Sequence, residues 1–104
     1  MTKVTIQPGP CKMTTVVEAE KIDQSTAKVK ITTDCKFYQP LQEELTEVDA
    51  YQEIFGKFGE GEVYTVCAKY CKHPTCPVPS GILKAVEAEC GLALPTDVTM
   101  TFEK

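Results

Sequence analysis

Two neighbouring β-rich segments, residues 13–22 and 26–33, constrain the fold of this chain more than any other feature of its sequence. Both are rich in valine, isoleucine and threonine, and the turn-prone Asp23-Gln-Ser25 joins them. The pattern predicts an antiparallel hairpin. Because a slip of one residue would move every side chain to the opposite face, the pairing register decides which face is buried.

Charge and hydrophobicity both favour the register that pairs Ile22 with Thr26. It places residues of opposite charge across from each other on one face, and these cross-strand pairs are Glu20 with Lys28 and Glu18 with Lys30. The other face is then apolar and carries Val17, Ala19, Val29 and Ile31. Continued in the same register, the hairpin brings Met13 opposite Cys35 and Cys11 near Phe37. Two distant cysteines would thus meet at its open end.

The rest of the chain supplies one further strand at each end and helices between them. Residues 2–7 alternate around Val4 and Ile6, and residues 98–102 alternate in the same way. Between them the apolar spacing predicts helices over residues 40–55, with a break near Thr46, then over 63–71 and over 77–90, the last ending at Gly91. The expected fold is therefore α+β: an antiparallel sheet of three N-terminal strands plus a C-terminal strand, with about three helices on one face.

Composition limits the class of protein. With 104 residues the chain is expected to form a single domain, residues 1–104, and no apolar run is long enough to span a membrane. The net charge is −4, and the eleven basic residues are all lysines, so nucleic acid is not an expected partner. The alternating N-terminus lacks the apolar core of a signal peptide, which predicts a cytoplasmic protein. In a reducing compartment, six cysteines favour metal binding, redox chemistry or buried thiols.

The densest chemistry lies in residues 67–76, which hold three cysteines and the only histidine. Cys76 stands just before the last predicted helix, where backbone amides and the helix dipole stabilise a thiolate. It is therefore the strongest functional candidate. His73 could be a metal ligand, an acid–base partner or a turn residue before Pro74. Cys90 lies on the apolar face of the last helix and is expected in the core.

Two metal sites are compatible with these residues. A local zinc site would use Cys67, Cys71, His73 and Cys76, although structural zinc sites usually take ligands from two separate elements. A composite site would instead use Cys11, Cys35 and Cys76 with His73 or Cys71. In that second arrangement Cys67, one helical turn before Cys71, belongs to the core.

The composite arrangement resembles the iron–sulfur scaffold proteins of the NifU/IscU type. The matching residues are Gly9-Pro-Cys11 before the hairpin, Cys35 after it, and His73 with Cys76 before the last helix. The resemblance implies an iron–sulfur cluster or zinc as cofactor and a scaffold or carrier role. The segments Cys76-Pro-Val-Pro-Ser and Gly91-Leu-Ala-Leu-Pro also look like an uncharacterised family of small cysteine-bearing proteins from anaerobic microbes.

Three functions follow as hypotheses. The first is a metal- or iron–sulfur-binding module that uses Cys11, Cys35, Cys71, His73 and Cys76. The second is a thiol-dependent redox or sulfur-carrier protein in which Cys76 is the nucleophile and Cys71 the resolving thiol. The third is a non-catalytic interaction protein in which the cysteines only pack. Each allows a protein partner, and none specifies an oligomeric state.

Overall fold

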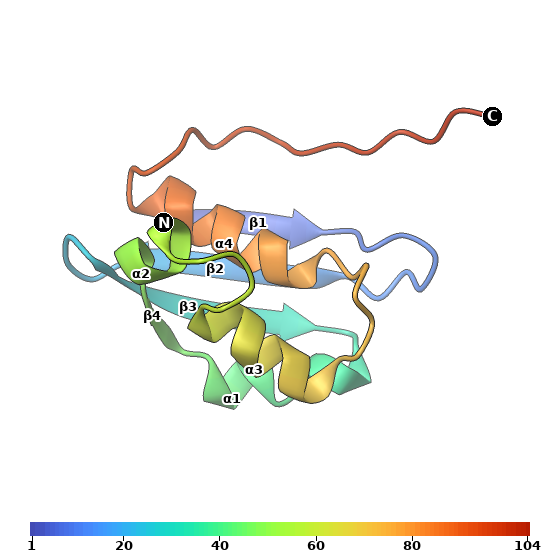
Figure 1. The fold of residues 1–104 in the computed structure, drawn as a ribbon, viewed down its shortest axis with the longest axis horizontal. Helices are drawn as coiled ribbons and strands as arrows, with labels where there is room; N and C mark the ends of the chain where they lie inside the picture. Colours follow the sequence, from blue (N-terminus) through green and yellow to red (C-terminus); the bar gives the residue numbers. More distant parts are fainter.

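The structure, a computed structural model, describes all residues from 1 to 104 and forms one antiparallel sheet with helices on one face (Figure 1). The strands are β1 Thr2–Ile6, β2 Thr15–Lys21, β3 Thr26–Thr33 and β4 Glu47–Asp49. The helices are η1 Lys36–Tyr38, a 3₁₀ turn, and α1 Leu41–Glu44, α2 Ala50–Phe55, α3 Glu62–Tyr70 and α4 Val78–Glu89. The α+β class predicted from the sequence is confirmed.

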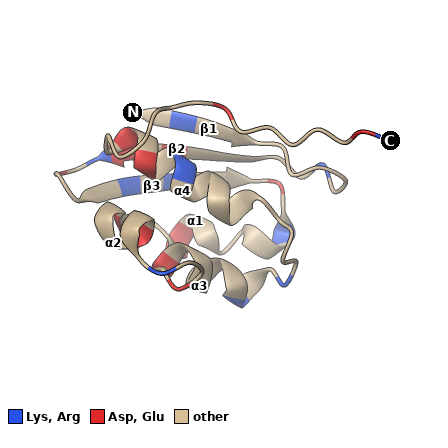
Figure 2. Cartoon of the chain, turned by 45° about the horizontal axis from the view of Figure 1, so that its top comes forward, with Lys and Arg blue, Asp and Glu red and all other residues tan.

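The hairpin of β2 and β3 has the register that its charges predict. Glu20 lies opposite Lys28 and Glu18 opposite Lys30. These side chains are exposed or half-buried and alternate with the buried ones. Charges of both signs are scattered over strands and helices alike (Figure 2). The inward side chains Val17, Ala19, Val29 and Ile31 are all buried. Register and burial thus agree, as expected where one face of a sheet is covered.

The pairing predicted beyond Thr15 stops after one more backbone hydrogen bond, from the N–H of Asp34 to the carbonyl oxygen of Thr14 at 3.1 Å. The ladder ends where Thr15 lies opposite Thr33, and the hydroxyls of these two buried threonines are 2.8 Å apart and hydrogen-bonded. The N–H of Cys35 donates to the Thr33 hydroxyl at 3.1 Å. On the other strand, Lys12 has a left-handed backbone with φ of 58° and closes a turn on Gly9. Met13 and Cys35 are therefore not a cross-strand pair.

Residues 40–55 differ from the prediction of two consecutive helices. Val48, read from its spacing as helical, lies in β4 opposite Ala27. A helix would have turned this apolar side chain away from the sheet, whereas the strand buries it. The second helix begins at Ala50, and its N-cap is Asp49, whose side chain accepts a hydrogen bond from the N–H of Gln52.

The predicted C-terminal strand was wrong. The fourth strand of the sheet is β4, beside β3, and residues 98–102 have no regular secondary structure. Their apolar side chains are exposed, from 61% for Val98 to 91% for Phe102. The alternation that predicts a strand is present, but a strand needs a neighbouring edge to bond with, and this segment makes no backbone hydrogen bond to β1.

The longest helix, α4, packs across β1 and β2 and runs from the cysteine-rich turn to Glu89. Its close approach to β1 depends on Gly81, because a Cβ there would overlap the Cδ1 atom of Ile6. No helix is long and apolar enough to cross a membrane. The two ends of α4 lie in different chemical surroundings, and its first turn leads into the candidate site.

Candidate thiol site

The end of α3 presents two cysteines from consecutive turns. Cys67 is buried on the core side of the helix, and the N–H of Cys71 donates to its carbonyl oxygen at 2.9 Å. Cys71 is the C-cap of α3, where the backbone becomes extended. Since residues four apart share one face of a helix, both thiols face the region that the next turn of chain enters.

The turn between α3 and α4 brings in Cys76. It is closed by a hydrogen bond from the N–H of Cys76 to the carbonyl oxygen of His73 at 3.0 Å. The His73 ring lies outside this turn, exposed, with its Nε2 atom 3.0 Å from the Thr75 hydroxyl. Cys76 is half-buried directly before Pro77, the N-cap of α4. The turn therefore directs one thiol inward and leaves the imidazole in solvent.

Tyr38 connects the two cysteines of the turn. It is 2% exposed and among the largest fully buried side chains in the protein. Burial raises the pKa of its hydroxyl, and the thiols of Cys76 and Cys71 beside it raise that pKa further. The phenol thus stays protonated over the pH range in which thiols ionise, and it can donate a hydrogen bond to either sulfur.

A third sulfur lies behind this pair. Burial raises the pKa of Cys67 to about 12, and the negative charges that Cys76 and Cys71 can carry oppose its ionisation as well. Cys67 therefore remains a neutral thiol under ordinary conditions. The sequence placed it in the core, and the structure confirms that it is buried, near enough to Cys71 and Cys76 for their charges to affect its pKa.

The remaining predicted site residues lie around this group rather than in it. Cys35 is half-buried at the start of η1, three residues before Tyr38, and packs against the core. Cys11 is exposed in the connection between β1 and β2. No three histidine, cysteine, aspartate or glutamate side chains are arranged to hold one metal ion. The structure thus brings Cys71 and Cys76 together with Cys67 and Tyr38.

Sequence reasoning missed Tyr38. It adjoins Phe37, and nothing in the order of two aromatic residues tells which one points inward. In the structure Phe37 is 65% exposed and Tyr38 is buried. The available signal was the predicted position of Cys35 at the end of the hairpin, since a residue three positions later in a tight turn returns to the same side.

An exposed cluster of Glu44, Lys69 and Tyr70 links α1 to the last turn of α3. The carboxylate of Glu44, on α1, accepts hydrogen bonds from the Lys69 ammonium and the Tyr70 hydroxyl. The bond from Lys69, followed by that from Tyr70, holds the pKa of Glu44 below its usual range. These contacts join α1 to the turn that carries Cys71.

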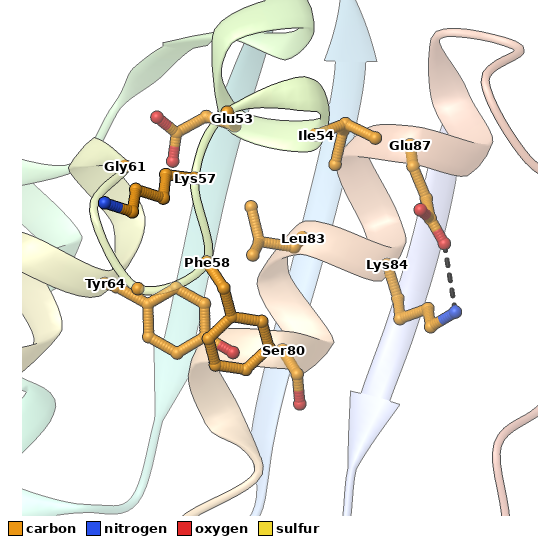
Figure 3. Close-up of a pocket in the computed structure, with 12 residues that line it drawn as sticks. Glu53, Ile54, Lys57, Phe58, Gly61, Tyr64, Ser80, Leu83, Lys84 and Glu87 are labelled. Carbon is orange, nitrogen blue, oxygen red and sulfur yellow. Dashed lines mark ion pairs between the residues drawn. The ribbon is translucent and has the colours of Figure 1, made fainter.

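A cavity of about 260 Å³ lies at the opposite end of α3 and contains no cysteine (Figure 3). Phe58 and Tyr64 stand beside each other there, with ring centroids 5.8 Å apart, and Leu83 of α4 lies behind them. Glu53 belongs to the wall, but its carboxylate is used as a cap for α3, since it accepts the N–H groups of Glu62 and Val63 at 2.8 Å. This cavity is therefore separate from the candidate thiol site.

Comparison with known proteins identifies a family but no activity. A family model described as a family of unknown function (DUF6951) matches residues 2–102. No curated protein and no solved structure matches the chain. The match agrees with the expected uncharacterised family, while its anaerobic origin and the likeness to NifU/IscU scaffolds stay predictions.

Proposed function

We propose that this chain, which belongs to the DUF6951 family of unknown function, acts in thiol–disulfide exchange through Cys76 and Cys71. One observation carries the proposal: both thiols are half-buried and adjoin the hydroxyl of the same buried residue, Tyr38. A pair of partly accessible thiols beside a fixed hydrogen-bond donor is what a dithiol site requires.

Each cysteine has a distinct role in the exchange. The Cys76 thiolate attacks one sulfur of a partner disulfide, which forms a mixed disulfide and releases the first partner thiolate. The Cys71 thiolate then attacks the Cys76 sulfur and releases the second partner thiolate. The partner disulfide gains two electrons, and these are the two that Cys71 and Cys76 lose as they form a disulfide and their protons pass to solvent. A second dithiol, by the reverse exchange, returns the site to its reduced form.

The surroundings distinguish the attacking thiol from its neighbours. Cys76 lies before the first turn of a twelve-residue helix, where N–H groups and the helix dipole favour negative charge. Tyr38 remains a donor, because the pKa of its hydroxyl is raised. Cys67 cannot replace Cys76 as the nucleophile, because its pKa of about 12 keeps it protonated. The expected partner is a protein disulfide in a reducing compartment such as the cytoplasm.

An aryl disulfide reagent tests this assignment. The reduced protein should show a fast phase that releases two aryl thiolates and leaves a Cys71–Cys76 disulfide, read by peptide mass mapping. Cys71→Ser should stop at a stable mixed disulfide on Cys76, and Cys76→Ser should lose the fast phase. Cys90→Ala, remote from the turn, is the matched control and should react like the unaltered protein. A fast phase that survives in Cys76→Ser would refute the role of Cys76.

The position of Cys67 supports a second candidate function, the binding of a metal or iron–sulfur cluster. The charges that Cys76 and Cys71 can carry raise the pKa of Cys67, so the three thiols lie in one region. Three thiols in one region suit zinc or iron–sulfur chemistry. The side chains do not surround a metal position as they stand, so they would have to rotate toward a common point. In this alternative Cys11, Cys35 and His73 remain predicted additional ligands of a scaffold or carrier.

Metal analysis separates the two functions. After anaerobic purification, stoichiometric zinc, or iron with acid-labile sulfide, would favour the metal-binding alternative, provided that it is lost in Cys76→Ser. A metal-free folded protein that forms the Cys71–Cys76 disulfide would favour exchange. A protein that does neither would leave the cysteines as packing residues of an interaction protein.

A further inference from the structure

The C-terminal segment after α4 exposes an amphipathic pattern to solvent. Its apolar side chains are between 61% and 91% exposed, and they are Leu94, Val98, Met100 and Phe102. Residues 98–102 alternate apolar and threonine side chains, which is the pattern of a strand with one buried face. The family match extends to residue 102 and so includes this segment. A strand-forming segment of the family domain is thus left without a partner.

An equally long acceptor lies in the same molecule. In the strand order β1-β2-β3-β4, β1 bonds to β2 along one side only, and the other edge of its five residues is free. The segment runs beside β1 in the direction of that strand (Figures 1 and 2), yet no backbone hydrogen bond joins the two. A free edge is a template for an added strand.

We propose that residues 100–103 of one copy add as an antiparallel strand to the free edge of β1 in a second copy, opposite residues 3–6, and that the exchange is reciprocal. The register places Phe102 opposite Val4 and Met100 opposite Ile6, on the face that the helices cover. Both β1 residues are at least half-buried there.

The polar face supports the same register. Glu103 then lies opposite Lys3, an exposed residue whose other neighbour across the sheet is Glu18. Opposite charges in directly facing positions stabilise a strand pair. Thr101, between the two apolar residues, lies opposite Thr5 and falls on this polar face as well, so every paired residue has the side that its chemistry requires.

A second copy fits the edge better than the chain's own segment. The segment runs parallel to its own β1 (Figure 1), whereas all three strand pairs of the sheet are antiparallel. Antiparallel pairing is also the more stable form per residue. Because donor and acceptor lie on each chain, a two-fold exchange satisfies both edges at once and closes the assembly.

The mass of the full chain in solution tests the proposal. Light scattering coupled to size exclusion, over a concentration series, should give a dimer, with amides of residues 100–103 protected from hydrogen exchange. Met100→Pro removes one N–H and the extended pairing, and it should give a monomer with an unchanged far-UV spectrum. Thr96→Pro, which lies before the paired segment, is the matched control and should remain dimeric.

A charge exchange tests the register itself. Because the reciprocal exchange contains this cross-strand pair twice, Lys3→Glu should weaken the dimer up to about 30-fold, and the double variant Lys3→Glu with Glu103→Lys should restore it. A monomer at every concentration would overturn the proposal, and protected amides in that monomer would assign the edge to the chain's own segment. A dimer unaffected by Met100→Pro would place the interface elsewhere.

Discussion

At its first turn α4 meets thiols and a buried phenol, whereas at its last turn it meets β1 and β2 through a carboxylate. Glu89 accepts hydrogen bonds from the Thr2 hydroxyl at 2.8 Å and the Lys21 N–H at 2.9 Å. At the other end, Tyr38 and Cys67 are buried as neutral groups. One end of the helix is therefore stabilised by groups that must stay protonated, and the other by a group that must stay ionised.

The two ends of α4 are therefore expected to limit the stability of the protein at opposite extremes of pH, the Glu89 end in acid and the Cys67 end in alkali. The Lys21 N–H, above all, holds the pKa of Glu89 below its usual range, so the contribution of Glu89 is complete above that range and is lost as the pH falls through the lower folded value. Cys67 has a raised pKa, so the unfolded chain loses this proton first and stability falls as the pH rises. The following predictions separate the two ends, from the largest expected effect to the smallest.

Removing the Tyr38 ring should produce the largest loss. Tyr38→Ala leaves a cavity beneath the thiols, and truncation of a buried aromatic residue costs about 3–5 kcal/mol of unfolding free energy. Urea denaturation measures the change. Tyr38→Phe is the control, since it keeps the ring and removes only the hydroxyl, and it should cost about 1 kcal/mol. Equal losses in both variants would mean that the hydroxyl, not the packing of the ring, stabilises this end.

The alkaline limb should depend on Cys67. Between pH 9.0, the ordinary thiol pKa, and about 12, the thiol of Cys67 is ionised in the unfolded chain but protonated in the folded protein. The free energy of unfolding therefore falls as the pH rises through this range. The slope is roughly 1.4 kcal/mol per pH unit for one such group. Cys67→Ala should flatten this limb in urea denaturation at a series of pH values. Cys11→Ala, at an exposed position, should leave the slope as it is; an unchanged slope in Cys67→Ala would assign the limb to Tyr38.

The acid limb should depend on Glu89. Glu89→Gln keeps the shape of the side chain but removes the charge, and it should cost about 1–2 kcal/mol at neutral pH, as expected for hydrogen bonds to a partly exposed carboxylate. The two proteins should converge in stability as the pH falls through the folded pKa of Glu89. Glu87→Gln, which breaks an exposed pair with Lys84 at 3.1 Å, is the control. A difference that persists in acid would contradict an electrostatic origin.

Local pattern predicted the elements whose partners are neighbours in sequence. The β2–β3 register followed from cross-strand charges, and Cys90 was correctly placed in the core. Residues 98–102 have an equally clear alternation, but a pattern cannot say whether an edge is available. Val48 fits helical spacing and strand alternation alike, so only its pairing with Ala27 decided the outcome.

The candidate site was predictable in its cysteines and not in its geometry. Cys71 and Cys76 were identified from their positions at the ends of two helices. The hairpin does not continue as a ladder to Met13 and Cys35, because Lys12 takes a left-handed conformation and the ladder ends at Thr15. The sequence Gly9-Pro-Cys11 does not specify this turn. Tyr38 was missed because the order of two aromatic residues does not tell which one points inward, and only its spacing from Cys35 favours Tyr38 over Phe37.

The smallest effect is expected at the exposed ion pair beside the thiol end. Lys69→Met removes the ammonium that Glu44 accepts but keeps the aliphatic stem and leaves the bond from Tyr70. Because both charged groups are in contact with solvent, the loss should be the smallest of the series and should shrink at high salt. Thermal denaturation at low and high ionic strength measures it. A larger, salt-independent loss would show that the exposed cluster positions the last turn of α3, and the rate at which Cys71 reacts should then change in the same variant.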